Sequence, residues 1–283
     1  MTRFPDFLII GAMKAGTTTL YDDLRNTPSI YLPPEKEPED LAFDTVLTPE
    51  GAAAYASKFK AAPVDGLCGE ASTAYSKHPQ YGQVEQRAIQ VIGPQLKIIY
   101  ILRHPIKRIT SQYRHLVGLG VEDRPFDQAV REDPSYINIS RYGYQLTSWQ
   151  AVLPSRNIHL LSFEHYLADR KKHLQDVRTF LGLNSEFSFR DSHLNASEGK
   201  RVVPQNSPLR SVMKSRIYQY GVKPLLSNKA KSAVKSLILP RAKKTEGRLD
   251  ETGSRETLEF LHSALQDDDL AGPLLRSNSD GSL

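Results

Sequence analysis

Short runs of apolar residues alternate with stretches of helical periodicity along most of the 283-residue chain. Each apolar run is bounded by turn-forming residues, which is the pattern of a buried strand. The predicted strands are Phe7–Gly11, Leu67–Glu70, Lys97–Leu102 and Ile158–Phe163. The predicted helices are Thr17–Asn26, Gly51–Ala61, Gln83–Ile92, Ile106–Gly118, Phe126–Glu132, Tyr142–Leu153 and Lys171–Leu181. This alternation is typical of βαβ units, so we predict an α/β fold with a central parallel sheet flanked by helices.

The strand-and-helix pattern does not continue to the end of the chain. We assign residues 1–210 to an α/β core and residues 211–283 to a helical C-terminal extension packed on that core. Residues 224–248 carry an apolar stripe with lysines largely outside it, which predicts either a helix packed on the core or a peripheral contact with a membrane. Residues 255–265 form another predicted helix, and we expect residues 276–283 to be frayed.

Composition limits the environment and the ligands of the protein. The chain is 39% hydrophobic and 24% charged, as in globular proteins, and no apolar run has the length of a membrane span. Met1–Asp6 runs directly into the first predicted strand and Cys68 is the only cysteine, so we expect no secretion signal, no internal disulfide and a cytoplasmic protein. The alternative is a soluble part of a membrane-anchored enzyme, which would look similar. A net charge of +5 favours anionic ligands. Zinc-ligand spacing and RNA-binding aromatic motifs are lacking, so we expect no nucleic-acid partner, while the oligomeric state stays open.

The segment between the first predicted strand and the first predicted helix has the composition of a phosphate-binding loop. Its sequence is Gly11-Ala12-Met13-Lys14-Ala15-Gly16-Thr17. Glycines permit a tight turn, and backbone N–H groups at a helix N-terminus converge on an anion. The triphosphatase pattern G-x-x-x-x-G-K-[ST] is nearly matched, but Thr17 follows Gly16 and the lysine, Lys14, lies inside the loop. We therefore predict a P-loop-like three-layer fold whose loop differs from the triphosphatase pattern at its lysine.

A second polar element follows the strand predicted at residues 97–102. Arg103 comes directly after the strand, and Pro105 lies near the first turn of the next helix. Because ligands collect at the carboxyl ends of parallel strands, we expect Arg103 at the same rim as the glycine loop. Its planar guanidinium suits a phosphate, and Ser111, two turns into the helix, offers a hydroxyl. The alternative is that Arg103 pairs with a carboxylate of a helix.

Three motifs form an ordered set that resembles a known family. Lys14-Ala15-Gly16-Thr17-Thr18 resembles that family's 5′-phosphosulfate loop, and Arg103 to Ser111 is similar to its 3′-phosphate element. Lys36-Glu37-Pro38 with Phe43 is similar to the acceptor-side segment of its carbohydrate branch. The family is that of the sulfotransferases that use 3′-phosphoadenosine-5′-phosphosulfate (PAPS), and the resemblance is strongest to the heparan-sulfate-type branch, which has a glutamate base. Further similarity extends it over residues 5–210, in Gly69–Tyr75, Arg141–Leu146 and Leu160–Glu164.

The resemblance implies a donor site for PAPS, with adenosine 3′,5′-bisphosphate as the product and no metal required. Lys14 would neutralise the charge that develops on the bridging oxygen as the sulfuryl group leaves. Arg103 and Ser111 would hold the 3′-phosphate, and Phe163 would pack against the adenine. The residues implied in binding the 5′-phosphate are Lys14, Ala15, Gly16, Thr17, Thr18 and Thr19. The loop implied to close over the donor contains Gly199, Lys200 and Arg201, and whether Lys200 or Arg201 makes the contact is open.

The acceptor side needs a general base for in-line attack by a hydroxyl or amine. The resemblance singles out Glu37, and we expect its acidic neighbours to raise its pKa; the alternative is an exposed acidic turn. Glu70 is a reserve candidate that is equally well explained as a buried carboxylate. The acceptor-side contacts implied are Lys36, Glu70, Tyr75 and Tyr142. The acceptor is expected to be a carbohydrate, a glycoconjugate or a small metabolite.

Two other functions are compatible with parts of this pattern. A P-loop kinase or nucleotide hydrolase would use the same kind of loop, but it is disfavoured because no lysine follows Gly16. A basic interaction protein that holds a nucleotide structurally is a non-enzymatic alternative, and residues 223–248 would then contact a membrane or a nucleic acid.

Overall fold

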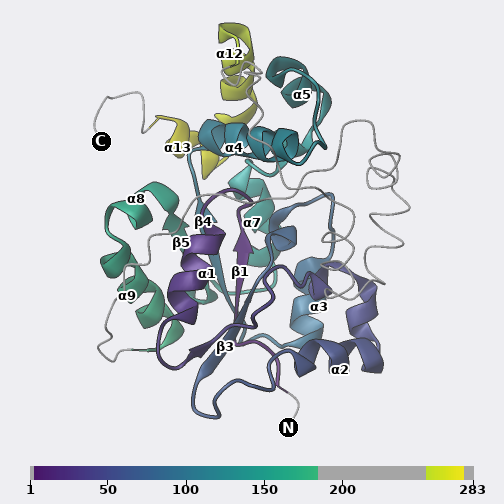
Figure 1. The fold of residues 1–283 in the computed structure, drawn as a ribbon, viewed down its shortest axis with the longest axis vertical. Helices are drawn as coiled ribbons and strands as arrows, with labels where there is room; N and C mark the ends of the chain where they lie inside the picture. Colours follow the sequence, from purple (N-terminus) through teal and green to yellow (C-terminus); the bar gives the residue numbers. More distant parts are fainter. Residues whose placement is uncertain (1–2, 184–252, 277–283) are drawn as a thin grey trace.

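The sheet at the centre of the molecule has five parallel strands in the order β2-β3-β1-β4-β5. The computed structural model describes residues 3–183 and 253–276, and Figure 1 gives their arrangement. The strands are β1 (Phe7–Gly11), β2 (Ile30–Tyr31), β3 (Leu67–Ala71), β4 (Lys97–Leu102) and β5 (Ile158–Ser162). Every residue of β1 is buried, and all but the first residue of β4 are buried. Such strands are covered on both faces, as parallel strands of an α/β fold are, so the predicted fold class is confirmed.

Helices cover the sheet and extend beyond one end of it. The helices are α1 (Thr17–Arg25), α2 (Pro49–Ser57), α3 (Val84–Val91), α4 (Pro105–Gly118), α5 (Phe126–Glu132), α6 (Ser135–Asn138), α7 (Tyr142–Gln150), α8 (Phe163–Ala168), α9 (Arg170–Leu181), α12 (Arg255–Leu265) and α13 (Ala271–Arg276). Short 3₁₀ turns occupy Asp40–Ala42, Asp44–Leu47, Thr73–Ser76 and Ser155–Asn157. In Figure 1, α8 and α9 lie on one side of the central strands and α2 and α3 on the other. The helices α4, α5, α12 and α13 gather at one end of the molecule.

Local capping explains where the predicted and observed boundaries differ. The strand β5, predicted at Ile158–Phe163, ends at Ser162 because the Ser162 hydroxyl accepts the His165 N–H and starts α8. Helix α2 starts at Pro49, where the Thr48 hydroxyl accepts the N–H of Gly51. The strand β2 was not predicted, since two residues are too few to produce a period. Its pairing with Leu67 and Cys68 makes it the edge of the sheet.

A second hydrophobic core joins the described end of the chain to the α/β core. The side chains of α12 and α13 pack with those of α4, α5 and α6, and the buried residues are Ile109, Tyr113, Phe126, Ala129, Val130, Tyr136, Leu261, Leu265 and Leu275. The predicted helix at residues 255–265 has the bounds of α12. The proposed division at residue 210 and the stretch 224–248 lie outside the described residues, so both stay predictions.

Asp268 makes the closest polar link between the two parts. Its Oδ1 accepts the N–H of Gly143 at 2.8 Å, and its Oδ2 accepts the N–H of Tyr144 at 3.1 Å. These N–H groups belong to the first turn of α7, where intrahelical acceptors are lacking. The same carboxylate accepts the N–H of Ala271 at the start of α13. One side chain therefore caps two helices that lie far apart in the sequence.

We predict that Asp268→Ala lowers the free energy of unfolding by about 2 kcal/mol, because two helix N-termini each lose a cap worth about 1 kcal/mol. Urea denaturation with an unchanged m-value measures the loss. The neighbouring Asp267 is exposed, and Asp267→Ala is expected to change stability by less than about 0.5 kcal/mol. Equal losses in the two variants would contradict the capping role.

Candidate active site

The loop between β1 and α1 has the shape of an anion-binding turn. Gly16 precedes α1 with φ of +89°, and Lys14 has φ of +68°. Among the residues that the structure describes, no side chain caps the N-terminus of α1. The first N–H groups of this nine-residue helix therefore face the loop, and no capping side chain accepts their hydrogen bonds. The positive end of the helix dipole lies at the same place. Within the helix start Thr17 is buried, Thr18 is exposed and Thr19 is intermediate.

Arg103 lies at the same rim of the sheet, as expected. Its Nη1 donates to the carbonyl of Lys14 at 3.0 Å. Its Nε is buried and has no hydrogen-bond partner in the described structure. Burial lowers the pKa of its guanidinium from the ordinary value. Within residues 3–183 and 253–276 no carboxylate forms an ion pair with Arg103, but the charge of Glu164 on α8 acts against the effect of burial on its pKa, so the alternative of a helix carboxylate stays open. An anionic ligand would accept a hydrogen bond from this unpartnered Nε and would offset the charge of the partly buried guanidinium.

Phe163 closes one side of this loop. Its ring lies beneath the Arg103 guanidinium, with 5.0 Å from the Arg103 Cζ to the ring centroid. A Cβ atom placed on Gly16 would come within 2.4 Å of the same ring. The position therefore requires glycine for two reasons, the positive φ and the close approach of the ring. The structure brings Phe163, Gly16 and Arg103 together, while Ser111 lies on the half-exposed part of α4.

Glu37 is held on the acceptor side by the end of β3. Its Oε2 accepts the N–H of Thr73 at 2.7 Å and the Thr73 hydroxyl at 3.1 Å, and its own N–H donates to the Ala71 carbonyl at 2.9 Å. Lys36 forms an ion pair with its Oε1. The Glu37 side chain keeps 30% of its surface exposed, so it can reach a bound molecule.

The expected rise in the pKa of Glu37 is wrong. Burial acts to raise the pKa, but the charge and hydrogen bond of Lys36, the charge of Lys77 and the Thr73 N–H outweigh it. The pKa of Glu37 is consequently lowered from its ordinary value. The charges that decide it are lysines rather than the acidic residues nearby in the sequence, so the carboxylate stays ionised and able to accept a proton.

Three residues expected to contact the acceptor are buried instead. Glu70 is 1% exposed, accepts the Tyr55 hydroxyl, and accepts the Ser72 hydroxyl at 2.8 Å. Burial raises the pKa of Glu70 to about 7. The Tyr75 hydroxyl accepts the N–H of Leu41, and the Tyr142 hydroxyl donates to the carbonyl of Arg103 at 2.7 Å. The polar groups of Glu70, Tyr75 and Tyr142 are thus bonded inside the protein, and their direct contact with the acceptor stays a prediction.

Sequence reasoning missed one charged residue at the site. Arg108 on α4 is fully buried, and its Nη1 contacts the carbonyl of Met13 in the loop. The signal was its place on the apolar side of α4, next to buried Ile109 and Tyr113, where an arginine is unusual. The residues Gly199, Lys200 and Arg201 lie outside the described residues, so their contact with the donor stays a prediction.

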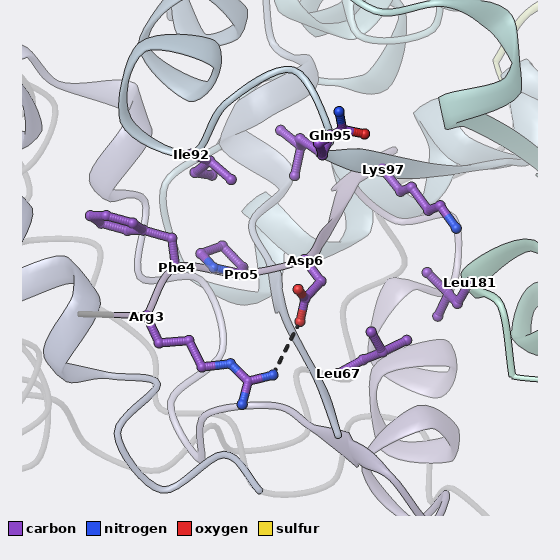
Figure 2. A pocket seen from close by; sticks show the side chains of 10 residues that line it. Arg3, Phe4, Pro5, Asp6, Leu67, Ile92, Gln95, Lys97 and Leu181 are labelled. Carbon is purple, nitrogen blue, oxygen red and sulfur yellow. Dashed lines mark hydrogen bonds and ion pairs between the residues drawn. The ribbon is translucent and has the colours of Figure 1, made fainter. Parts of the chain in front are cut away.

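A separate cavity lies at the other end of the strands from the loop, and Figure 2 shows it in close-up. Its volume is about 430 Å³, and its lining includes Arg3 and Asp6, which form an ion pair, and Leu67, Lys97 and Leu181. Leu67 and Lys97 begin β3 and β4, so the cavity is at the amino ends of the strands. Ligands of open parallel sheets bind at the carboxyl ends, where the loop and Arg103 lie.

In the described part of the chain, no three His, Cys, Asp and Glu side chains are grouped as metal ligands. None of the helices in the described ranges is long and apolar enough to cross a membrane.

Together, the fold and the loop define an α/β protein with a loop of phosphate-binding shape at the rim of a parallel sheet. Residues 5–187 match the model of the sulfotransferase family, which is more than half of the chain. The chain therefore belongs to the sulfotransferase family.

Individual relatives agree with this assignment. Heparan sulfate glucosamine 3-O-sulfotransferase 6 of Mus musculus is 27% identical over 216 residues, which are 70% of this chain and 58% of the relative. Bifunctional heparan sulfate N-deacetylase/N-sulfotransferase of Drosophila melanogaster is 25% identical, over 62% of this chain and 19% of the relative. The chain thus spans little more than half the length of the 3-O-sulfotransferase. The crystal structure of a sulfotransferase from Alicyclobacillus acidocaldarius superposes with a TM-score of 0.59 at 26% identity, over 69% of this chain and 87% of that one.

We predict that Gly16→Ala lowers the free energy of unfolding by at least about 1 kcal/mol, because alanine is strained at positive φ and its Cβ meets the Phe163 ring. In the double variant Gly16→Ala/Phe163→Ala the loss should be smaller than the sum of the two single losses, since the steric part is removed. Thermal unfolding of the three variants measures this coupling. Gly118→Ala is the control, because Gly118 lies in α4 with open space around it. Strict additivity would show that Phe163 does not press on the loop.

Proposed function

We propose that this protein transfers a sulfuryl group from PAPS to a hydroxyl or amine of an acceptor. The observation that carries the proposal is Arg103, whose guanidinium is tied to the Lys14 carbonyl while its Nε is buried without a partner in the described structure. PAPS has a 3′-phosphate in addition to the 5′-phosphosulfate, and it supplies an activated sulfuryl group when bound. A loop for one anion and an arginine for a second, at one rim, support that donor.

Each residue of the site has its own role in binding the donor. The N–H groups at the start of α1 and the threonine hydroxyls of Thr17, Thr18 and Thr19 hold the 5′-phosphate. Arg103 and Ser111 hold the 3′-phosphate. Lys14, inside the loop rather than after Gly16, stabilises negative charge on the bridging oxygen of the leaving group. This position of the lysine is what separates the site from one for nucleoside triphosphates.

On the acceptor side, Glu37 accepts the proton of the attacking hydroxyl or amine. Its carboxylate is partly exposed and is oriented by Thr73, and Lys36 keeps it ionised. A carbohydrate or glycoconjugate acceptor is supported by the heparan sulfate sulfotransferases among the relatives, at about one quarter identity. The absence of a metal requirement, the cytoplasmic location, the lack of a nucleic-acid partner and the membrane contact through residues 224–248 stay predictions.

We predict metal-independent binding of adenosine 3′,5′-bisphosphate in calorimetry, with much weaker binding of Mg-ATP. Arg103→Ala should weaken the bisphosphate about ten- to a hundredfold, the worth of a charge-assisted hydrogen bond, because the 3′-phosphate loses its cation. Adenosine 5′-monophosphate, which lacks that phosphate, should lose far less. A preference for Mg-ATP would favour a kinase or nucleotide hydrolase, and equal losses for both adenosine ligands would remove Arg103 from the 3′-phosphate.

For the base, Glu37→Gln is expected to keep the bisphosphate affinity and to lose transfer activity by about two to four orders of magnitude. A screen of labelled sulfuryl transfer to candidate acceptors provides the assay. Glu35→Gln, at an exposed carboxylate nearby, is the matched control and should keep its turnover.

The pH profile of the same reaction tests the environment of Glu37. Lys36 lowers the pKa of Glu37, so Lys36→Met should raise that pKa and move the acid limb of kcat/KM to higher pH. An acid limb that stays in place would assign the limb to another group.

A further inference from the structure

Arg108 is a cation enclosed by neutral groups beneath the phosphate loop. Its Nε donates to the Ser140 hydroxyl at 2.6 Å, and its Nη2 donates to the Tyr136 carbonyl at 2.7 Å. Its Nη1 donates to Gln112 Oε1 at 2.7 Å and makes a longer contact, at 3.5 Å, with the Met13 carbonyl. The residue is 0% exposed. Every nitrogen of the guanidinium thus has a partner, and none of these partners carries a charge.

The charge of Arg108 is not balanced by the described protein. The described partners of Arg108 are all neutral, although a buried cation is costly unless it is paired. Burial lowers the pKa of Arg108 to about 10, which still leaves it charged at neutral pH. Arg103 adds a second positive charge close by and acts in the same direction. Two arginines therefore concentrate positive potential at one loop, and an anion bound there would offset it.

The contacts of these two arginines with the loop are successive along the backbone. Arg108 meets the Met13 carbonyl and Arg103 meets the Lys14 carbonyl. In a trans peptide the carbonyl and the following N–H point in opposite directions. Holding the Met13 carbonyl against Arg108 consequently turns the N–H of Lys14 away from the interior.

We propose that Arg108 is a positioning residue of the donor site: it fixes the loop through the Met13 carbonyl, and the 5′-phosphate of the donor balances its buried charge. The proposal rests on the function proposed above. It assigns the two arginines to different ends of the donor, because Arg103 serves the 3′-phosphate directly whereas Arg108 acts through the loop that binds the 5′-phosphate.

The test compares three ligands by calorimetry: adenosine 3′,5′-bisphosphate, adenosine 5′-monophosphate and adenosine 3′-monophosphate. Arg108→Met should weaken the two ligands that carry a 5′-phosphate by about tenfold or more, the scale of a charge-assisted contact, and leave the 3′-monophosphate within about twofold of the wild type. A uniform loss for all three ligands would overturn the proposal. Failure of the wild-type protein to bind any of them would instead overturn the proposed function.

Arg87 provides a matched control for a structural role. Arg87 is also buried, with 9% of its surface exposed. It donates to the Leu41 and Gly82 carbonyls and forms an ion pair with Asp44, away from the loop. Arg87→Met should lower the melting temperature, and its affinity for each of the three ligands should equal that of the wild type. If Arg108→Met reproduces that behaviour, Arg108 is structural only and the proposal fails.

A milder variant decides the question if Arg108→Met does not fold. Arg108→Lys keeps the charge but loses the planar fork that reaches Ser140, Tyr136 and Met13 together. Its affinity for the 5′-phosphate ligands should fall about two- to fivefold, with the 3′-monophosphate unchanged. Equal changes for the three ligands, or no change for any, would contradict the proposal.

Discussion

The hydrogen bond from Arg103 to the Lys14 carbonyl depends on the order of strands in the sheet. Its two residues are 89 positions apart, and they meet because β1 and β4 are parallel neighbours at the centre of the sheet. Parallel neighbours end at the same rim, so the loop after β1 and the arginine after β4 are brought together by backbone pairing rather than by local sequence. The donor site is therefore a property of the sheet topology.

A chain of polar contacts supports that bond from far away in the sequence. Asp268 caps the start of α7, the hydroxyl of Tyr142 in α7 binds the carbonyl of Arg103, and Arg103 binds Lys14. The segment between α12 and α13 is thus coupled to the position of Arg103. Tyr142 holds the backbone of Arg103 through this hydrogen bond, which explains why a residue of the Arg141–Leu146 motif is fully buried.

The features that could be predicted from the sequence are those set by residues close together along the chain. The central strands and most helices were predicted because buried parallel strands are unbroken apolar runs. Gly16 and Arg103 were predicted for a similar reason, since a loop after a strand and a charge after a strand are visible in one dimension. The two-residue β2 has no period, and the change from β5 to α8 is set by the Ser162 cap, so neither could be read from the pattern.

Features that depend on spatial neighbours were not predictable. In the sequence, Glu37 lies among carboxylates and directly after Lys36, and only the fold shows that Lys36, Lys77 and the Thr73 N–H outweigh burial and lower its pKa. The sequence places Arg108 on the apolar side of α4, but its enclosure by Ser140 and Tyr136 is visible only in the fold. Both residues depend in part on groups contributed by other elements.

The acceptor side follows the same logic one strand further along the sheet. The segment that carries Glu37 is fixed to the end of β3 by the Ala71 carbonyl and by Thr73, and the Ser72 hydroxyl accepts the N–H of Glu39. Because β3, β1 and β4 are adjacent in that order, Glu37, the loop and Arg103 also follow one another along the rim. An in-line transfer needs the attacking group and the leaving group on opposite sides of the sulfuryl group. In the proposed function, Glu37 on the β3 side takes the proton of the attacking group and the loop after β1 holds the leaving 5′-phosphate, so the two come from neighbouring strand ends.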